Sequence, residues 1–366
     1  MWWWAVVDVA YRPAIGSLFS GYGGLDLAVE HVFGGQTVWH SETERAPARL
    51  LAHRFPGVPN LGDITRVNWD AVPRVDILAG GFPCQDLSSA GKRAGLAPGT
   101  RSGLWAHMAY AIEKLRPRLV VFENVRGLLN APSAPTPVRP LDRRDLGSDG
   151  QGGTRALGTV LGDLAERGYD CRWLGLPASA IGAPHQRFRV FGLAWPRGTD
   201  PRGVQPERRR GRRRLPGTRP PALRLPVGGA AAGAEANTLA GRGASSRVDW
   251  GRFTPAIRHW ERVLGREAPF PIVPVRGRDR LNPEWVEWLM GLESGWVTDV
   301  PGISRTMAMK MLGNGVVPAQ GATAIRLLLE PISAELEHQF GAHHESTTND
   351  HGSTTRHSQN QSGRTV

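Results

Sequence analysis

The sequence predicts an α/β fold in which a largely parallel sheet carries crossover helices. Between residues 15 and 195, short β-rich runs alternate with segments of helical periodicity, as a parallel sheet with crossover helices would require. The β-rich runs end in glycines or polar residues, and sites in such sheets lie at the carboxyl ends of the strands. At 366 residues, the chain is long enough for two or three domains with a sizeable core.

The expected elements follow one another in chain order. The strands are AIGSLFSG (14–21), QTVWHSE (36–42), RVDILAGGF (74–82), RLVVFENV (118–125) and RVFGLA (189–194). The helices are LDLAVEHVF (25–33), LWAHMAYAIEKLRP (104–117) and RALGTVLGDLAERGY (155–169). Further on, Trp285, Trp288, Leu289 and Leu292 recur at helical spacing, which predicts a packed helix face.

Other segments lack this pattern. Residues 1–14 are interpreted as an N-terminal extension, and residues 130–153, rich in Pro, Gly, Asp and Arg, as a long surface loop. Residues 196–249 are arginine-rich with little periodicity, which fits either a linker or a basic recognition surface. The tail, residues 336–366, has almost no apolar content and is expected to be disordered.

The net charge of the chain is +12 and comes mainly from arginine. Guanidinium groups suit phosphate and guanine, which favours a nucleic-acid partner; a GC-rich genome explains the charge equally well. Two cysteines exclude a disulfide framework and favour a reducing, cytoplasmic compartment. No apolar run of about 18 residues predicts a membrane span, and the scattered histidines have no metal-ligand spacing.

The stretch SLFSGYGGLD (17–26) has the composition of a strand, a glycine-rich turn and a helix. A nucleotide-like cofactor could approach the backbone closely at Gly21, Gly23 and Gly24. The stretch lacks the GxGxxG spacing of dinucleotide sites and the GK[ST] of a P-loop. No lysine stands ready for a phosphate, so a cofactor without phosphates, such as S-adenosylmethionine, fits better. A turn that serves packing alone is the competing interpretation.

Two acidic residues extend this candidate site. Glu42 ends the next strand, where a carboxylate accepts hydrogen bonds from ribose hydroxyls. GDIT (62–65) offers Asp63 for the polar edge of an adenine and Ile64 for its face. Acidic residues at loop ends are common on protein surfaces. Taken alone, Glu42 and Asp63 therefore fit a binding role and a surface role equally well.

Cys84, in GGFPCQDLSSAGK, is the candidate nucleophile. The residues around it do not continue a core strand, and Lys92 and Arg93 make the neighbourhood electropositive, which lowers a thiol pKa. The alternative, a small buried hydrophobe, suits Cys171, which lies in a strand-like run.

Further candidates follow two other strands. Glu123 ends a strand, where a partly buried carboxyl could act as an acid, or could merely form a cap or a salt bridge. Arg187 and Arg189 are two positions apart and are expected on one strand face, turned toward an anion or a carbonyl, or on a solvated edge.

Taken together, these motifs occur in one order: SLFSGYGG, Glu42, GDIT, GGFPCQDLSSAGK, RSGLW, FENV, HQRFRVF and GNGVVP. This order resembles the DNA cytosine-5 methyltransferase family of bacterial and phage modification enzymes. The resemblance covers residues 15–195 and 281–330. It implies a Rossmann-like, S-adenosylmethionine-dependent methyltransferase sheet with a smaller, irregular target-recognition domain. Residues 15–195 would be the catalytic and cofactor-binding domain, 196–297 the target-recognition domain, and 298–335 a segment that returns to the catalytic domain.

The resemblance also implies roles for single residues. Cys84 would attack C6 of a cytosine flipped out of the duplex, and Glu123 would hold or donate a proton at the ring N3. Asn124 would orient that loop, while Arg189 would grip the cytosine O2 with support from Arg187. The implied cofactor contacts are Phe19, Gly21, Gly23, Gly24, Glu42, Asp63, Ile64 and Asn314. The implied DNA contacts, in a segment that closes over the base, are Gln85, Ser88, Lys92 and Arg93.

The implied setting is a monomer that acts on double-stranded DNA, with a cognate restriction endonuclease as a functional partner.

The sequence departs from the family pattern at three positions. Ser17 stands where the family often has Asp, and His185 stands where it usually has Gln. Gly315 stands where the family often has a small hydroxyl residue or Ala. An RNA cytosine methyltransferase ranks lower because that branch has a different run after Pro-Cys-Gln. An inactive DNA-binding relative ranks low because Cys84 and Glu123 are both present. A dehydrogenase would need GxGxxG.

Overall fold

A six-stranded sheet in the order β2-β1-β3-β4-β6-β5 forms the centre of the fold. The computed structural model describes residues 11–83, 103–130, 156–204 and 248–330. The parallel strands are β1 (Ala14–Leu18), β2 (Gln36–Ser41), β3 (Ile77–Gly80) and β4 (Leu119–Val125). Five of the six strands overlap the strands expected from the sequence, and β5 overlaps the strand-like run that contains Cys171.

The last two strands correct the expectation of a largely parallel sheet. β6 (Arg189–Pro196) runs antiparallel to β4, and β5 (Tyr169–Leu176) runs antiparallel to β6. The chain passes from β5 to β6 through a single 3-10 turn, Ala178–Ile181, instead of a crossover helix. Residues 177–188 contain no crossover helix that would carry the chain back along the sheet, and β5 and β6 are accordingly an antiparallel pair.

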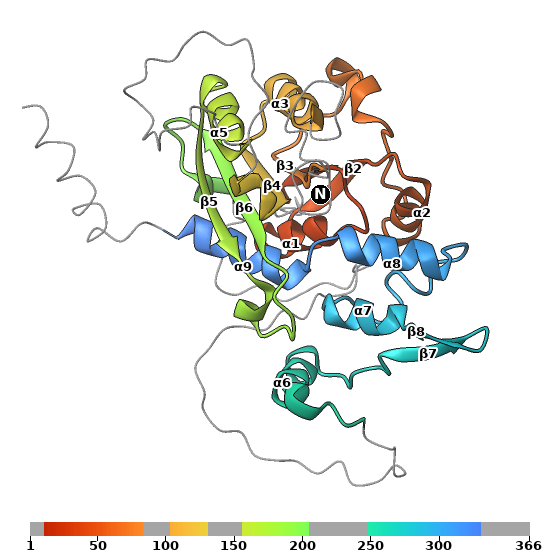
Figure 1. Cartoon of the computed structure of the whole chain (residues 1–366). Helices are drawn as coiled ribbons and strands as arrows, with labels where there is room; N and C mark the ends of the chain where they lie inside the picture. The colour runs from red at the N-terminus through yellow and green to blue at the C-terminus, as the bar shows by residue number, and fades with distance from the viewer. Residues whose placement is uncertain (1–10, 84–102, 131–155, 205–247, 331–366) are drawn as a thin grey trace, which may run out of the picture. The chain divides into compact units, whose positions relative to one another are not determined.

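Helices cover both faces of the sheet (Figure 1). On one face, α1 (Gly24–Phe33) and α9 (Pro318–Leu329) pack on a buried cluster that contains Ile15, Val121 and Phe191. On the other face, α3 (Leu104–Leu115) and α5 (Ala156–Glu166) pack on a cluster with Leu78 and Val120. A short helix, α4 (Gly127–Asn130), follows β4. The helices predicted over 25–33, 104–117 and 155–169 are therefore confirmed.

A third buried cluster joins the later part of the chain to the first helices. Its members come from α2 (Arg45–Arg54), α6 (Thr254–Leu264), α7 (Pro283–Leu289) and α8 (Arg305–Asn314). Trp288 is fully buried and its ring stacks on Trp285 at 5.1 Å, which confirms the packed face predicted there. Leu292 lies beyond the end of α7 but is buried in the same cluster.

A separate two-stranded hairpin, β7 (Ile272–Val275) with β8 (Arg278–Leu281), completes the described elements. The predicted domain boundaries stay a prediction. The tail and most of the predicted N-terminal extension and 130–153 loop lie outside the described residues. Within the described ranges, no helix combines the length and apolar character that crossing a membrane requires.

Candidate active site

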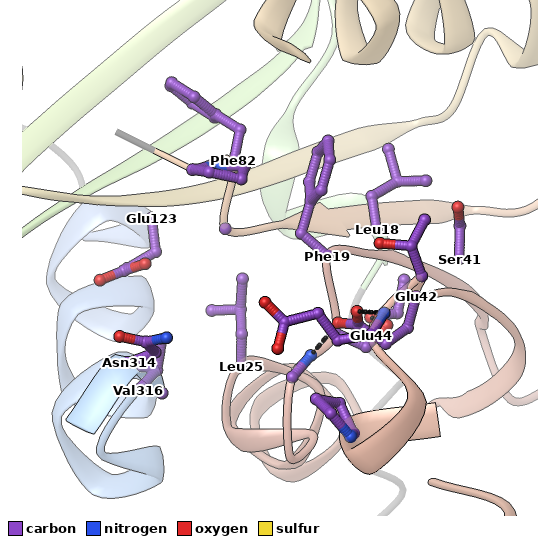
Figure 2. A pocket seen from close by; sticks show the side chains of 18 of the residues that line it. Leu18, Phe19, Leu25, Ser41, Glu42, Glu44, Phe82, Glu123, Asn314 and Val316 are labelled. Atoms are coloured by element: carbon purple, nitrogen blue, oxygen red, sulfur yellow. Dashed lines mark hydrogen bonds between the residues drawn. The ribbon is translucent and has the colours of Figure 1, made fainter. Parts of the chain in front are cut away.

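A pocket of about 650 Å³ opens at the edge where the parallel strands end. The residues that follow β1, β2 and β3, together with the end of β4, line it, and the C-terminal end of α8 closes another side. In Figure 2, Glu123, Asn314 and Val316 lie on one side of the pocket and Phe19, Leu18 and Glu42 on the opposite side. This volume is in the range of small-molecule sites, roughly 300–1,000 Å³.

The turn after β1 is held by an acidic residue. Phe19 and Gly21 have left-handed backbone conformations, with φ of 54° and 56°. The Glu42 carboxylate accepts hydrogen bonds from the backbone N–H of Gly21 at 2.9 Å and of Glu44 at 2.8 Å. Burial raises the pKa of Glu42, while these N–H groups oppose the shift. The Gly21 amide, which could otherwise face a phosphate, is therefore committed to a carboxylate that would repel one.

Asn60, which sequence reasoning missed, ties the end of β2 to the GDIT segment. Its side-chain oxygen accepts from the backbone N–H groups of Glu42 at 3.0 Å and Gly62 at 3.1 Å. Its side-chain amide donates to the Glu42 carbonyl at 3.0 Å. An Asn two residues before a glycine is a turn signal, but nothing local in the sequence indicates that its partner is Glu42.

Asp63 and Ile64 both line the pocket. The Asp63 carboxylate accepts from the N–H and hydroxyl of Thr65, each at 2.9 Å, and these bonds lower its pKa. Ile64 is buried. The segment therefore presents an apolar wall beside a fixed carboxylate, which suits a flat heterocycle with polar edges.

Glu123 and Arg189 form the charged centre of the opposite side. Because β4 and β6 are antiparallel with Val125 opposite Arg189, Glu123 is a diagonal neighbour of Arg189 on the same face. Glu123 Oε1 and Arg189 Nε are 2.8 Å apart, with side chains only 9% and 12% exposed. Burial raises the pKa of Glu123, against the opposing charges of Arg189 and Arg187. Such a buried carboxyl keeps its proton to a higher pH than an exposed one, which suits a group that releases a proton to a substrate.

Asn124 positions the loop that leads toward Cys84. Its side-chain amide donates to the Phe82 carbonyl at 3.1 Å, and its oxygen accepts from the Val125 N–H at 2.8 Å. A Cβ at Gly81 would lie 3.1 Å from a Glu123 carboxylate oxygen, so the glycine lets the loop pass close to that acid. Pro83 lines the pocket. Cys84, Gln85, Ser88, Lys92 and Arg93 lie outside the described residues.

Arg187 does not share a strand face with Arg189, which corrects the prediction for this pair. β6 begins at Arg189, and Arg187 precedes it in irregular chain. Its guanidinium donates to the backbone carbonyls of Gly313, at 2.9 Å, and Gly315. Arg187 therefore connects the start of β6 to the end of α8, on either side of Asn314.

The α8 wall reaches across the pocket through a second contact. Lys310 Nζ and Glu44 Oε2 form an ion pair at 2.7 Å, and both residues line the pocket. Tyr22 donates its hydroxyl hydrogen bond to the Val316 carbonyl at 2.6 Å. These contacts join segments of the chain that are remote in sequence, and the sequence contains no local signal for them.

The structure thus brings most of the predicted residues to one pocket. Those that line it are Phe19, Gly21, Gly24, Glu42, Asp63, Ile64, Glu123, Asn124, Arg189 and Asn314. Gly23 does not line it; a Cβ there would meet the ring of Phe55. Cys171 lies in β5, where burial raises its pKa to about 12, so the thiolate is not accessible near neutral pH. The described residues contain no His, Cys, Asp and Glu group that could hold a metal ion.

A family model for the C-5 cytosine-specific DNA methylase matches residues 14–210, more than half of the chain. The chain belongs to this family. Among curated methylases, it is 33% identical over 179 residues to the Type II methyltransferase M.NgoBV of Neisseria gonorrhoeae, covering 48% of this chain and 39% of the relative. It is 32% identical over 178 residues to M.MspI of Moraxella sp., covering 49% and 37%. The matched region thus spans less than half the length of these relatives.

Solved structures support the fold of this chain. The S. pombe Dnmt2 methyltransferase superposes with a TM-score of 0.53 at 14% identity, covering 88% of this chain and 100% of that one. A variant of Spodoptera frugiperda DNMT2 gives 0.51 at 16% identity, covering 87% and 100%. At these identities the likeness is evidence for the fold alone, and it confirms the predicted α/β methyltransferase-type sheet.

Proposed function

We propose that the chain is a site-specific DNA methyltransferase that transfers a methyl group from S-adenosylmethionine to C5 of a flipped-out cytosine. The observation that carries the proposal is the buried Glu123–Arg189 pair, at 2.8 Å, in the same pocket as Glu42 and Asn314. An acid with a raised pKa beside a fixed cation suits a cytosine ring, in which N3 must be protonated and the neighbouring O2 must be bound.

The pocket residues fit S-adenosylmethionine better than a phosphate-bearing cofactor. The Gly21 N–H donates to Glu42, and Lys310 pairs with Glu44, so neither group is free for a phosphate. Glu42 would accept from ribose hydroxyls, and Phe19, Asp63 and Ile64 would hold the adenine. Asn314 would contact the cofactor from the α8 side. When bound, S-adenosylmethionine supplies an electrophilic methyl group on its sulfonium sulfur.

In the proposed reaction the chain activates the cytosine from one side. The Cys84 sulfur forms a bond to C6 while Glu123 keeps a proton at N3 and Arg189 binds O2. The electron pair of the C5–C6 double bond would then be available at C5, which would accept the methyl group while the bond from that group to the sulfonium sulfur breaks and its electron pair stays on the sulfur. Loss of the C5 proton to a water molecule and cleavage of the sulfur–C6 bond restore the double bond and release 5-methylcytosine.

The proposed setting is the cytoplasm of a bacterium or phage-infected cell, where a monomer would protect DNA in a restriction-modification system with a cognate endonuclease. Type II methyltransferases among the relatives support this part of the proposal. The residues that choose the target sequence are proposed to lie in the arginine-rich region between about 196 and 280.

Transfer of labelled methyl groups from S-adenosylmethionine to unmethylated duplex DNA tests the proposal directly. Wild-type protein and Cys171→Ser, the matched control, should label DNA, and Cys84→Ser should not. Duplex DNA that contains 5-fluorocytosine should trap a covalent complex with the wild type and with Cys171→Ser, but not with Cys84→Ser. Equal labelling by Cys84→Ser would disprove the covalent route, and label found in RNA in place of DNA would disprove the substrate. Bisulfite sequencing of host DNA then gives the methylated site.

A further inference from the structure

The β7–β8 hairpin displays arginines on a ribbon that takes no part in the core. The two strands are joined by Arg276 and Gly277, both with positive φ, 52° and 73°, as a two-residue hairpin turn matched to strand twist requires. No residue of either strand belongs to a buried cluster among the described residues, and every residue of β8 is exposed.

The base of the hairpin is nevertheless fixed to the rest of the molecule. Asn282, which caps α7, donates its side-chain amide to the Phe270 carbonyl at 2.9 Å, and its backbone N–H donates to the Pro271 carbonyl at 2.8 Å. Arg305, at the start of α8, donates to the Leu281 carbonyl at 2.6 Å. A two-stranded hairpin alone is marginal in water, so these anchors give the ribbon a defined position beside the helices.

The register places two of the arginines together. Arg278 is opposite Val275 and Arg280 is opposite Val273, so both project from one face, about 6.8 Å apart along the strand. Asp279, opposite Pro274, projects from the other face. Like charges on one face of a ribbon repel each other and destabilise it.

These arginines also lack protein partners. Within the described residues, Arg276, Arg278 and Arg280 take part in no ion pair and no side-chain hydrogen bond. Some exposed cations elsewhere do have carboxylate partners, as Arg202 has Asp200 at 2.8 Å and Lys310 has Glu44 at 2.7 Å. The hairpin therefore presents three exposed guanidinium groups to solvent, two of them on one face, an arrangement that suits an anionic ligand.

We propose that this hairpin binds the phosphate backbone of the substrate duplex through Arg276, Arg278 and Arg280. These three residues lie in the region proposed to choose the target sequence, and they add affinity while other residues of that region make the choice. The inference rests on the proposed DNA substrate. Guanidinium forks match phosphate oxygens, and a two-stranded ribbon has the dimensions to lie along a DNA groove. Contacts of this class position a protein on DNA and carry no sequence information.

The test is the salt dependence of duplex binding by the full chain. Each phosphate contact contributes about 0.9 to the slope of log affinity against log salt concentration. Arg278→Gln and Arg280→Gln should each reduce the slope by about that amount, and their double variant by the sum. Arg278→Lys should retain it. The matched control is Arg202→Gln, which removes the same charge from an exposed residue that already has a partner; its slope should equal that of the wild type.

Methylation patterns complete the experiment. The variants should weaken binding to all duplexes by the same factor and methylate the same sites as the wild type. If the hairpin variants and Arg202→Gln give equal slopes of log affinity against log salt concentration, the hairpin does not contact DNA. If Arg278→Gln changes which sequence is methylated, the hairpin reads bases and the proposal is wrong. A wild-type protein that labels no DNA would instead overturn the proposed function, so the two failures are distinct.

Discussion

The ring of Tyr22 occupies the space in which a side chain at position 315 would begin. Tyr22 is fully buried, and its hydroxyl donates to the Val316 carbonyl. Gly315 itself has φ −73° and ψ −179°, an extended conformation that any residue adopts. The glycine is therefore required for steric reasons alone, and the departure from the family pattern at this position is explained by its neighbour.

Gly315→Ala should consequently destabilise the protein by overpacking, by about 1–3 kcal/mol. Tyr22→Leu in the same chain removes the ring that causes the overlap, so the double variant should lose less free energy of unfolding than the two single variants added together. Urea unfolding of the four proteins measures this coupling. Additive losses would show that Tyr22 is not what excludes a side chain at position 315.

The two arginines of HQRFRVF, predicted from the sequence to act together, should give different kinetic defects. Arg187 binds backbone carbonyls on both sides of Asn314, so Arg187→Gln should weaken S-adenosylmethionine binding with a smaller effect on kcat. Arg189 pairs with Glu123, so Arg189→Gln should retain cofactor affinity and lose about 100-fold or more in kcat. Calorimetric cofactor binding and single-turnover methyl transfer separate the two. The same defect in both variants would contradict the assignment.

At the scale of elements, a buried acid and a buried histidine lie between α1 and β2. Asp26 Oδ2 and His40 Nε2 are 3.9 Å apart, and each side chain is 1% exposed. Burial raises the pKa of Asp26 to about 7 and lowers the pKa of His40 to about 4. Between these values both groups are neutral in the folded protein, although both are charged when the chain unfolds.

When either residue of the pair is replaced, the free energy of unfolding should change with pH in opposite directions in the two variants. In Asp26→Asn only His40 remains, whose pKa is about 4 when folded and 6.5 as its ordinary value. The unfolded chain then binds the proton more tightly, so the free energy of unfolding should rise between these pH values, by at most about 1.4 kcal/mol per unit. In His40→Gln only Asp26 remains, whose raised pKa makes the free energy of unfolding fall between pH 4 and about 7.

The wild type should have a flatter profile than either variant because the two contributions oppose each other. Urea unfolding at half-unit steps from pH 4 to about 7 measures all three curves. A flat or rising curve for His40→Gln itself would show that Asp26 is ionised in the folded protein.

The elements of this fold could be predicted largely because their signals are local. Each parallel strand is a short apolar run followed by glycine or a polar residue, and α1, α3 and α5 repeat apolar residues with helical period. The antiparallel direction of β6 has no such signal. It depends on the connection from β5, whose 3-10 turn is too short to be recognised from periodicity.

The site divides in the same way. Glu42 and Asp63 could be predicted because they follow a strand or a turn at the open edge of the sheet. Glu123 is expected from the sequence to end its strand, but β4 continues to Val125, so Glu123 lies two residues before that end. The contacts between Arg187 and Gly313, or between Lys310 and Glu44, join residues 126 and 266 positions apart. Such pairs result from tertiary packing, which a single sequence does not contain.

At the scale of the whole molecule, a helix from the segment after residue 298 covers the sheet, although it is remote from the strands in sequence. Ile325, Leu328 and Leu329 of α9 are buried against α1 and the central strands. Gln320, also buried, donates to the carbonyls of Leu176, at 2.7 Å, and Arg187, at 2.8 Å. Without α9, part of one face of the sheet, the carbonyl at the end of β5 and the carbonyl of Arg187 would be exposed to water.

A chain cut after residue 297 should therefore fail to fold, because burial of three large aliphatic side chains contributes roughly 5–9 kcal/mol, close to the total stability of a typical domain at about 5–15 kcal/mol. A chain cut after residue 335 lacks only the polar tail and should melt at the temperature of the full chain. Thermal unfolding followed by circular dichroism compares them, and a separate peptide of residues 298–335 should restore cooperative melting to the shorter chain. If the chain cut after residue 297 melts cooperatively at the temperature of the full chain, then α9 covers the sheet without stabilising it.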